Sequence, residues 1–385
     1  PFWLKLTCMP ELSWHSPRCH CSAGLLGQMH STRHRCRAAG ILLAGAVLRS
    51  QGVMRIALTR APRPAAQMGK FVEAGGLRLT NVFDWLYAAE IEAGTPGQPI
   101  WVSFDTGGKP TWLPGEAALA AGSQHTFFAP EVSTTHRVIN RNFVDDYGVS
   151  GRMARDALSF GPSMRIDGFD FGYATNISIQ GYQNKKYDGI VGLGFGTSAV
   201  PPLLQALQDA GQIEEPAFAF DFRHPGGFSE LTLGGPSPER GGGRFAYVDL
   251  VSSSWWSVRL DAVWLGDEVC ITRAGTASFS SFFSEVTGPK EQVTDFLAAW
   301  NATNRGGWWA IPCDQQGPPL RFRIQGRDYT LDKDDLIVRD GGECFLMIHG
   351  LDDNFWTLSL PFLRKFYTVF DAGRKQVGFA LPALP

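Results

Sequence analysis

The sequence has little net charge and no long apolar segment, and both absences narrow what the protein can be. Its 385 residues carry 35 Lys and Arg against 37 Asp and Glu, for a formal charge of −2. A nucleic-acid-binding protein needs a basic surface to meet phosphates, so no nucleic-acid partner is predicted. No apolar run reaches the roughly 18–20 residues of a membrane-spanning helix, so no membrane span is predicted either.

Cysteine is scarce in the body of the chain. Four of the seven cysteines fall within the first 36 residues, among histidines that raise the question of a zinc site. The segment Cys19-His20-Cys21 lacks the two-residue gap of a zinc knuckle, and no matched second pair follows it. The sequence therefore predicts no metal and no other cofactor.

Apolar residues, glycine and proline are abundant instead. The chain is 44% hydrophobic, which excludes global disorder, and its 44 Gly and 24 Pro favour a turn-rich β protein. Segments 86–92 and 100–104 alternate as a strand pair around the turn 94–97, and helical patterns are few, at 201–210, 290–302 and 360–364. We therefore predict an all-β fold of sandwich or barrel lobes. The length suggests two domains or one bilobal unit.

The first 69 residues read as a leader. Arg33, Arg35 and Arg37 precede the apolar run 38–48, which is the shape of a secretory signal. Two sequons, at Asn176 and Asn301, favour a secreted glycoprotein. We expect residues 1–69 to be a poorly ordered leader that contains this signal and a shortened propeptide.

A carboxylate on a tight glycine turn, Asp105-Thr106-Gly107, follows an apolar strand, and its surroundings resemble the pepsin-like aspartic endopeptidases, most closely the fungal type. The likeness covers about residues 70–384. Residues 54–60 also resemble the opening of a family propeptide. Beyond the Asp-Thr-Gly turn and Trp112, the matching segments occur in the family's order: 89–98 (AEIEAGTPGQ), 187–194 (YDGIVGLG), 231–235 (LTLGG), 287–289 (TGP), 311–313 (IPC) and 362–371 (FLRKFYTVFD).

The resemblance implies a bilobal pepsin-like fold, with an N-terminal lobe at 70–245, a C-terminal lobe at 246–385 and a deep cleft between them. Each lobe of such a protein contributes one aspartate, and the two carboxyl groups share a proton so that one acts as base and the other as acid. The resemblance makes Asp105 the first of them, and implies that Gly107, Trp112 and the flap contact substrate.

The resemblance also bears on the flap, the cysteines and the assembly. Phe143 aligns best with the flap tyrosine, and Tyr147 could replace that hydroxyl only after a local shift. Cys313 and Cys344 match the disulfide of the C-terminal lobe, which leaves Cys270 as a buried unpaired thiol. We expect a monomer.

The second aspartate is missing in either register that we consider. Counting back from Thr287 without gaps places Ser280-Ser281-Phe282-Phe283 on the second Asp-Thr-Gly turn; an alternative register uses segment 274–276 and places Arg273 at the catalytic position. We prefer the first, because the second requires an insertion before Thr287. Ser280 has no histidine partner in a cleft motif, so it is not predicted to be a nucleophile.

Further departures from the family pattern accompany this loss: Gly108, Phe282, Phe283, the flap residue Phe143 and segment 356–360 (WTLSL). We therefore predict a weak or inactive protease whose cleft still accepts a peptide or a small apolar ligand, with Asp105 as a partner for a ligand amine. The alternative is an active acid endopeptidase that uses an unrecognised second acid. The pairs Trp255-Trp256 and Trp308-Trp309 are predicted to pack in the core.

Overall fold

Strands dominate the described part of the chain, as the sequence predicts. The computed structural model describes Met54–Arg60, Leu79–Val82 and residues 86–196, 202–222, 229–237, 244–267 and 269–381, all of which belong to one compact unit at 49–385. The signal-like segment 33–48 and the cysteines and histidines before it lie outside the described residues. Among the residues described, no helix is long and apolar enough to cross a bilayer.

The largest sheet combines strands from both ends of the chain. The C-terminal strands β24 (Tyr367–Asp371) and β25 (Gln376–Ala380) join it beside β10 (Ala217–Asp221), so the two predicted lobes share this sheet. Its strands, in spatial order, are β12 (Ala246–Asp249), β25 (Gln376–Ala380), β24 (Tyr367–Asp371), β10 (Ala217–Asp221), β11 (Ser229–Leu233), β1 (Met54–Arg60), β2 (Leu79–Val82), β3 (Leu86–Ala93), β4 (Gln98–Asp105), β9 (Gly189–Gly192), β5 (Trp112–Pro114), β8 (Arg165–Ile177), β7 (Val149–Ser159) and β6 (Arg137–Val144).

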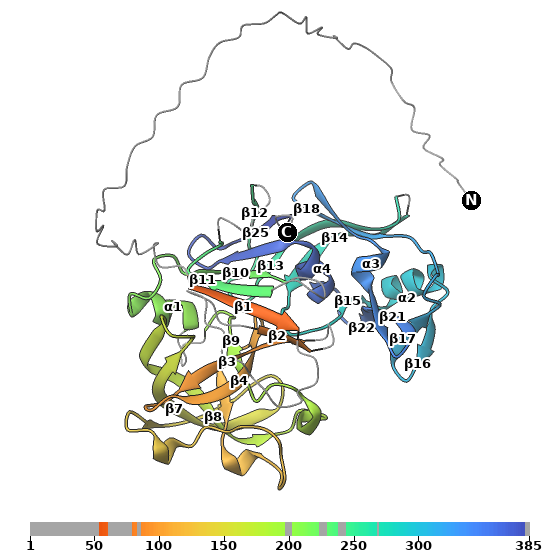
Figure 1. Cartoon of the computed structure of the whole chain (residues 1–385). Coiled ribbons are helices and arrows are strands. Elements are labelled where there is room, and N and C mark those ends of the chain that lie inside the picture. Colours follow the sequence, from red (N-terminus) through yellow and green to blue (C-terminus); the bar gives the residue numbers. More distant parts are fainter. Residues whose placement is uncertain are drawn as a thin grey trace, which may run out of the picture. The chain divides into compact units, whose positions relative to one another are not determined.

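Strand β1 differs from the sequence-based expectation. The segment Met54–Arg60 was expected within a poorly ordered leader, but it pairs antiparallel with β11 and parallel with β2 (Figure 1). A strand in the middle of a sheet forms backbone hydrogen bonds with a neighbour on each side. These hydrogen bonds, and not the composition of the segment, make Met54–Arg60 a strand.

Two smaller sheets, four α-helices and three short 3-10 helices complete the regular structure of the described residues; the 3-10 helices are η1 (Glu116–Ala118), η2 (Pro130–Val132) and η3 (Tyr182–Asn184). Helix α2 (Lys290–Ala299) buries Val293, Phe296 and Leu297, whose spacing places them on one face. The second sheet contains β19 (Arg327–Leu331), β18 (Leu320–Ile324), β13 (Ser257–Leu265), β14 (Val269–Phe279), β23 (Trp356–Leu358), β15 (Val286–Pro289) and β22 (Ile348–Leu351); the third contains β16 (Thr303–Arg305), β17 (Trp308–Ile311), β21 (Glu343–Leu346) and β20 (Ile337–Asp340); the helices are α1 (Leu203–Asp209), α2 (Lys290–Ala299), α3 (Lys333–Leu336) and α4 (Leu360–Lys365).

One arrangement of strands occurs twice. In the first half, β4 pairs with β3 and runs parallel to β9, while β5 pairs with β9 and β8. In the second half, β14 pairs with β13 and runs parallel to β23, while β15 pairs with β23 and β22. The chain beyond β4 and the chain beyond β14 therefore occupy equivalent places in the two sheets.

The aromatic pairs divide between core and surface. Trp256 is 2% exposed, and its indole N–H donates to the Leu193 carbonyl, as core packing predicts. Trp309 is half-buried against the core. The prediction is wrong for Trp255, which is 47% exposed, and for Trp308, which lies at the surface. Trp308 and Trp309 are neighbours in strand β17 (Trp308–Ile311), so they point to opposite sides. Trp255 lies in the bend that precedes β13, outside the sheet.

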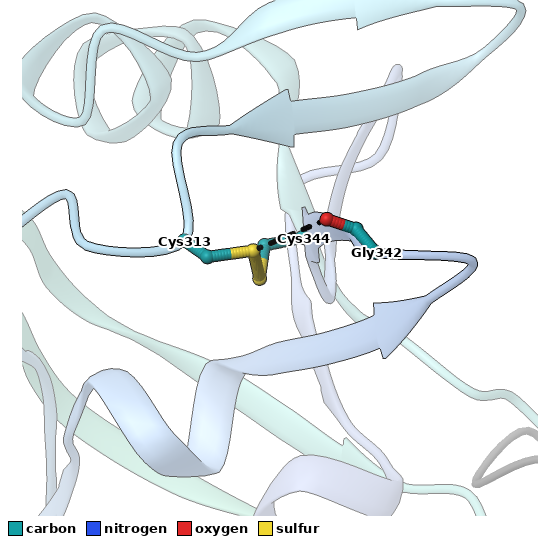
Figure 2. The surroundings of a disulfide bond; sticks show 3 residues. All are labelled: Cys313, Gly342 and Cys344. Carbon is teal, nitrogen blue, oxygen red and sulfur yellow. Dashed lines mark hydrogen bonds between the residues drawn. A yellow bond between two sulfur atoms is a disulfide. The ribbon is translucent and has the colours of Figure 1, made fainter.

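Cys313 and Cys344 form the predicted disulfide (Figure 2). Cys344 lies in β21 opposite Ile311 of β17, and Cys313 follows β17 after one further residue, so the strand pairing brings the two thiols together. Cys270 is free and half-buried rather than buried, and its thiol donates to the Thr272 carbonyl.

Replacing both Cys313 and Cys344 by alanine is expected to lower the free energy of unfolding by about 3–4 kcal/mol, because the closed loop spans 31 residues. Urea unfolding of the purified variant measures this loss. Cys270→Ala is the matched control and should change stability by less. A loss below about 1 kcal/mol in the double variant would contradict the prediction.

Candidate active site

Asp105 is the last residue of β4 and is fully buried. The Gly107 N–H donates to Asp105 Oδ1 at 2.8 Å, and the Tyr147 hydroxyl donates to Oδ2 at 2.7 Å. Each carboxylate oxygen therefore has one close donor, from the turn that follows β4 and from the hairpin between β6 and β7.

The pKa of Asp105 is raised to about 6, mainly because burial penalises the charged carboxylate. The hydrogen bonds from Tyr147, Gly107 and Gly108 oppose this shift, and the negative charge of Asp145 adds to it. Burial exceeds the hydrogen bonds, so Asp105 is a neutral carboxylic acid in mildly acidic solution.

The turn after β4 is tied to the segment after β14 by four reciprocal hydrogen bonds. The Thr106 N–H donates to Ser281 Oγ at 3.0 Å, and the Ser281 N–H donates to Thr106 Oγ1 at 3.1 Å. The Thr106 hydroxyl donates to the Phe279 carbonyl at 2.8 Å, and the Ser281 hydroxyl donates to the Phe104 carbonyl at 2.7 Å. The Thr106 hydroxyl thus bonds the carbonyl two residues before Ser281, and the Ser281 hydroxyl bonds the carbonyl two residues before Thr106. The two segments therefore make the same contacts with each other.

Ser280 binds its own loop. It is 6% exposed, and its Oγ lies within hydrogen-bond distance of the N–H groups of Phe282 at 3.3 Å and Phe283 at 3.2 Å. The Phe282 ring lies 5.2 Å from the Tyr147 ring and 5.8 Å from the Tyr187 ring. Phe283 is 46% exposed. Arg273, the catalytic position of the alternative register, lies in β14 opposite Ala262.

The β6–β7 hairpin places Tyr147, and not Phe143, over Asp105. Phe143 is buried against Gly172, where a β-carbon would lie 2.6 Å from the ring. Tyr147 lies in the turn that follows, which Asp145 Oδ1 closes by accepting from the N–H groups of Tyr147 and Val149. The hydroxyl that contacts Asp105 therefore comes from Tyr147, while Phe143 packs inside.

The other predicted contact residues differ in their access to the site. Gly107 adjoins Asp105, whereas Trp112 is 1% exposed and packs in the same cluster as Phe143. The sequon residues Asn176 and Asn301 are both exposed, so glycosylation there stays a prediction.

Two carboxylates near the predicted motifs escaped the sequence analysis. Asp145 is buried, and its pKa is raised mainly by burial. Glu285, which directly precedes β15, is half-buried, and burial raises its pKa to about 7. Neither residue belongs to a recognisable motif, and their burial depends on contacts between distant segments. Among the described residues, no cluster of three or more metal-ligating side chains occurs.

Comparisons with known proteins agree with this geometry. A family model described as eukaryotic aspartyl protease matches residues 86–382. Mouse cathepsin E is 31% identical, over 80% of this chain and 82% of its own length. Vacuolar protease A of Aspergillus fumigatus is 30% identical, over 78% and 80%, and dog renin is 30% identical, over 79% and 81%.

Burial of Asp105 makes stability depend on pH. Its folded pKa of about 6 lies above the ordinary value of 3.8, so the folded protein retains the proton longer than the unfolded chain. The contribution of Asp105 to stability is therefore fully present below about pH 4 and is lost as the pH rises through 6, a loss on the order of 3 kcal/mol by neutral pH.

In Asp105→Asn this part of the fall in stability between pH 4 and 7 should disappear, as measured by urea unfolding at both values. Asp353→Asn, at an exposed carboxylate, is the control. An unchanged pH dependence in Asp105→Asn would show that ionisation of Asp105 does not lower the stability of the folded protein.

Proposed function

Because the chain belongs to the eukaryotic aspartyl protease family, we propose that it is a pepsin-like protein that binds peptides in its cleft and has weak or absent proteolytic activity. Asp105 is the one family carboxylate that it retains. Its ligand is an extended peptide or a small apolar molecule.

The observation that carries this proposal is the reciprocal bonding of Thr106 and Ser281. Ser280 precedes Ser281 as Asp105 precedes Thr106, and β14 and β4 have equivalent neighbours. Both features support Ser280 as the counterpart of Asp105. A serine hydroxyl at that position cannot share a proton as a second carboxyl group does.

A single carboxyl group limits the chemistry. Peptide hydrolysis by this family needs one group to take a proton from water and another to hydrogen-bond or protonate the peptide carbonyl. Asp105 can fill one of these roles at a time. Loss of the partner removes roughly 10²–10⁴-fold of general acid–base catalysis.

Peptide binding does not require a second carboxyl group as catalysis does. The surroundings of Asp105 favour such binding. An exposed aromatic side chain lies beside the turn that follows Asp105: the edge of the Trp255 ring approaches Gly107. The disulfide and the sequons favour passage through a secretory compartment. Assignment to the fungal type and the monomeric state are part of the same proposal.

Cleavage of a denatured protein at pH 3–4, with and without pepstatin, tests the proposal. We expect no pepstatin-sensitive cleavage, and no difference between the wild-type protein and Asp105→Asn. The double variant Ser280→Asp/Phe282→Gly supplies a second carboxyl group and a small residue beside it, and is expected to gain pepstatin-sensitive cleavage. Wild-type cleavage as fast as that of the double variant, and abolished by both pepstatin and Asp105→Asn, would overturn the proposal.

One observation favours the alternative of an active acid endopeptidase. Asp145 is the carboxylate whose charge raises the pKa of Asp105, and it is itself buried at the turn that carries Tyr147. It is therefore the candidate second acid among the described residues.

The two proposals differ in one substitution. If Asp145 is the second acid, Asp145→Asn abolishes cleavage as fully as Asp105→Asn does, and the acid limb of the pH profile moves. Asp146→Asn, at the exposed neighbour in the same turn, controls for a general effect on the hairpin. Activity retained in Asp145→Asn would exclude it.

A further inference from the structure

Trp255 borders the Asp105 site from the second half of the chain. A β-carbon built on Gly107 would lie 3.4 Å from Asp105 Oδ1, 3.8 Å from the edge of the Trp255 ring and 3.9 Å from the Tyr147 hydroxyl. These three groups therefore converge on one point above Gly107. Trp255 is 47% exposed, so its ring offers an apolar surface directly beside the buried carboxyl group.

A cation lies on this ring. Lys109, four residues after Asp105, places Nζ 4.3 Å from the centre of the Trp255 ring and donates to the Ser254 carbonyl at 2.6 Å. An ammonium group has three donors, and the Ser254 carbonyl takes one. Lys109 is half-buried, and this burial lowers its pKa. A nearby anion therefore stabilises the charged ammonium form of Lys109.

The protein supplies no close anion of its own from the described residues. None of the ion pairs between them includes Lys109. The acidic group that acts on it through its charge is Asp146, in the exposed turn that also carries Tyr147. The Tyr147 hydroxyl donates to Asp105, so a ligand that bonds to Asp105 competes with the turn that also carries Asp146.

We propose that Lys109 and Trp255 form a subsite for a peptide carboxylate, which replaces the charge of Asp146 when a ligand occupies the cleft. The carboxylate belongs to an acidic side chain or to the C-terminus of the peptide, and adjacent apolar groups lie on the Trp255 ring. The inference rests on the proposed function, because it names the chemistry of the ligand that the cleft binds.

The charges near the subsite agree with this assignment. Asp105 is neutral in mildly acidic solution, so it does not repel an incoming carboxylate. A serine at position 280 adds no second negative charge. The side of the site that Lys109 and Trp255 form is therefore cationic and apolar, and it disfavours a ligand amine there.

Positional-scanning hexapeptides, acetylated and amidated, test the subsite. Each position in turn carries Glu or Gln, and a second set compares a free C-terminal carboxylate with the amide. Binding is measured by fluorescence polarisation at pH 5, where Glu is largely ionised. We expect the carboxylate form to bind about five- to twentyfold more tightly at one position or at the C-terminus, the size expected for one charged hydrogen bond at a partly exposed site.

Variants of Lys109 separate the charge from its packing. Lys109→Met keeps the length of the side chain and should abolish the preference for the carboxylate, while Lys109→Arg keeps the charge and should restore it. Lys290→Met, at an exposed lysine of α2, should leave the preference unchanged.

The outcomes distinguish the two levels of the proposal. Peptide binding without a carboxylate preference, or a preference that survives in Lys109→Met, overturns the subsite and leaves a peptide-binding cleft. Tighter binding of peptides with a free amine at this position overturns it as well. Failure of every peptide to bind overturns both the subsite and the proposed function.

Discussion

The reciprocal hydrogen bonds between Thr106 and Ser281 fix the position of the Asp105 turn relative to the Ser280 loop, and the rest of the site is built around these two segments. They join two turns that lie 175 residues apart, and all the atoms involved are buried. A buried hydroxyl that both donates and accepts leaves few other arrangements for its backbone. Threonine and serine serve equally here, because the contact uses the hydroxyl and the backbone. These hydrogen bonds therefore do not depend on whether the residue before Ser281 is an acid, and here that residue is Ser280.

Once these hydrogen bonds fix the turn, the surroundings of Asp105 decide whether its side chain is charged or neutral. Two hydrogen bonds favour the charged carboxylate, but full burial outweighs them. The Tyr147 hydroxyl and the Phe282 ring close the site from the hairpin and from the Ser280 loop. A carboxyl group kept neutral beneath aromatic side chains is suited to donating and accepting hydrogen bonds.

Much of the fold followed from local patterns. The strand pair around turn 94–97 and the helices α1, α2 and α4 lie where the sequence places them. Such elements depend on alternation, spacing and turn residues that a short window contains. Strand β1 was missed because its order comes from β11 and β2, which lie far away in the sequence. Trp255 was misjudged because a pair of tryptophans does not reveal which of them faces inward.

The sequence by itself determined the family resemblance, the presence of Asp105 and the absence of an aspartate at residues 280–283, because these are matters of residue identity and order. Tertiary structure alone decided that Tyr147 covers Asp105 while Phe143 packs inside, that burial raises the Asp105 pKa, and that Lys109 lies on Trp255. These features arise where separate turns meet in space. A short stretch of sequence predicts neither how far a charged group is desolvated nor which way a side chain points, because both depend on contacts with distant segments.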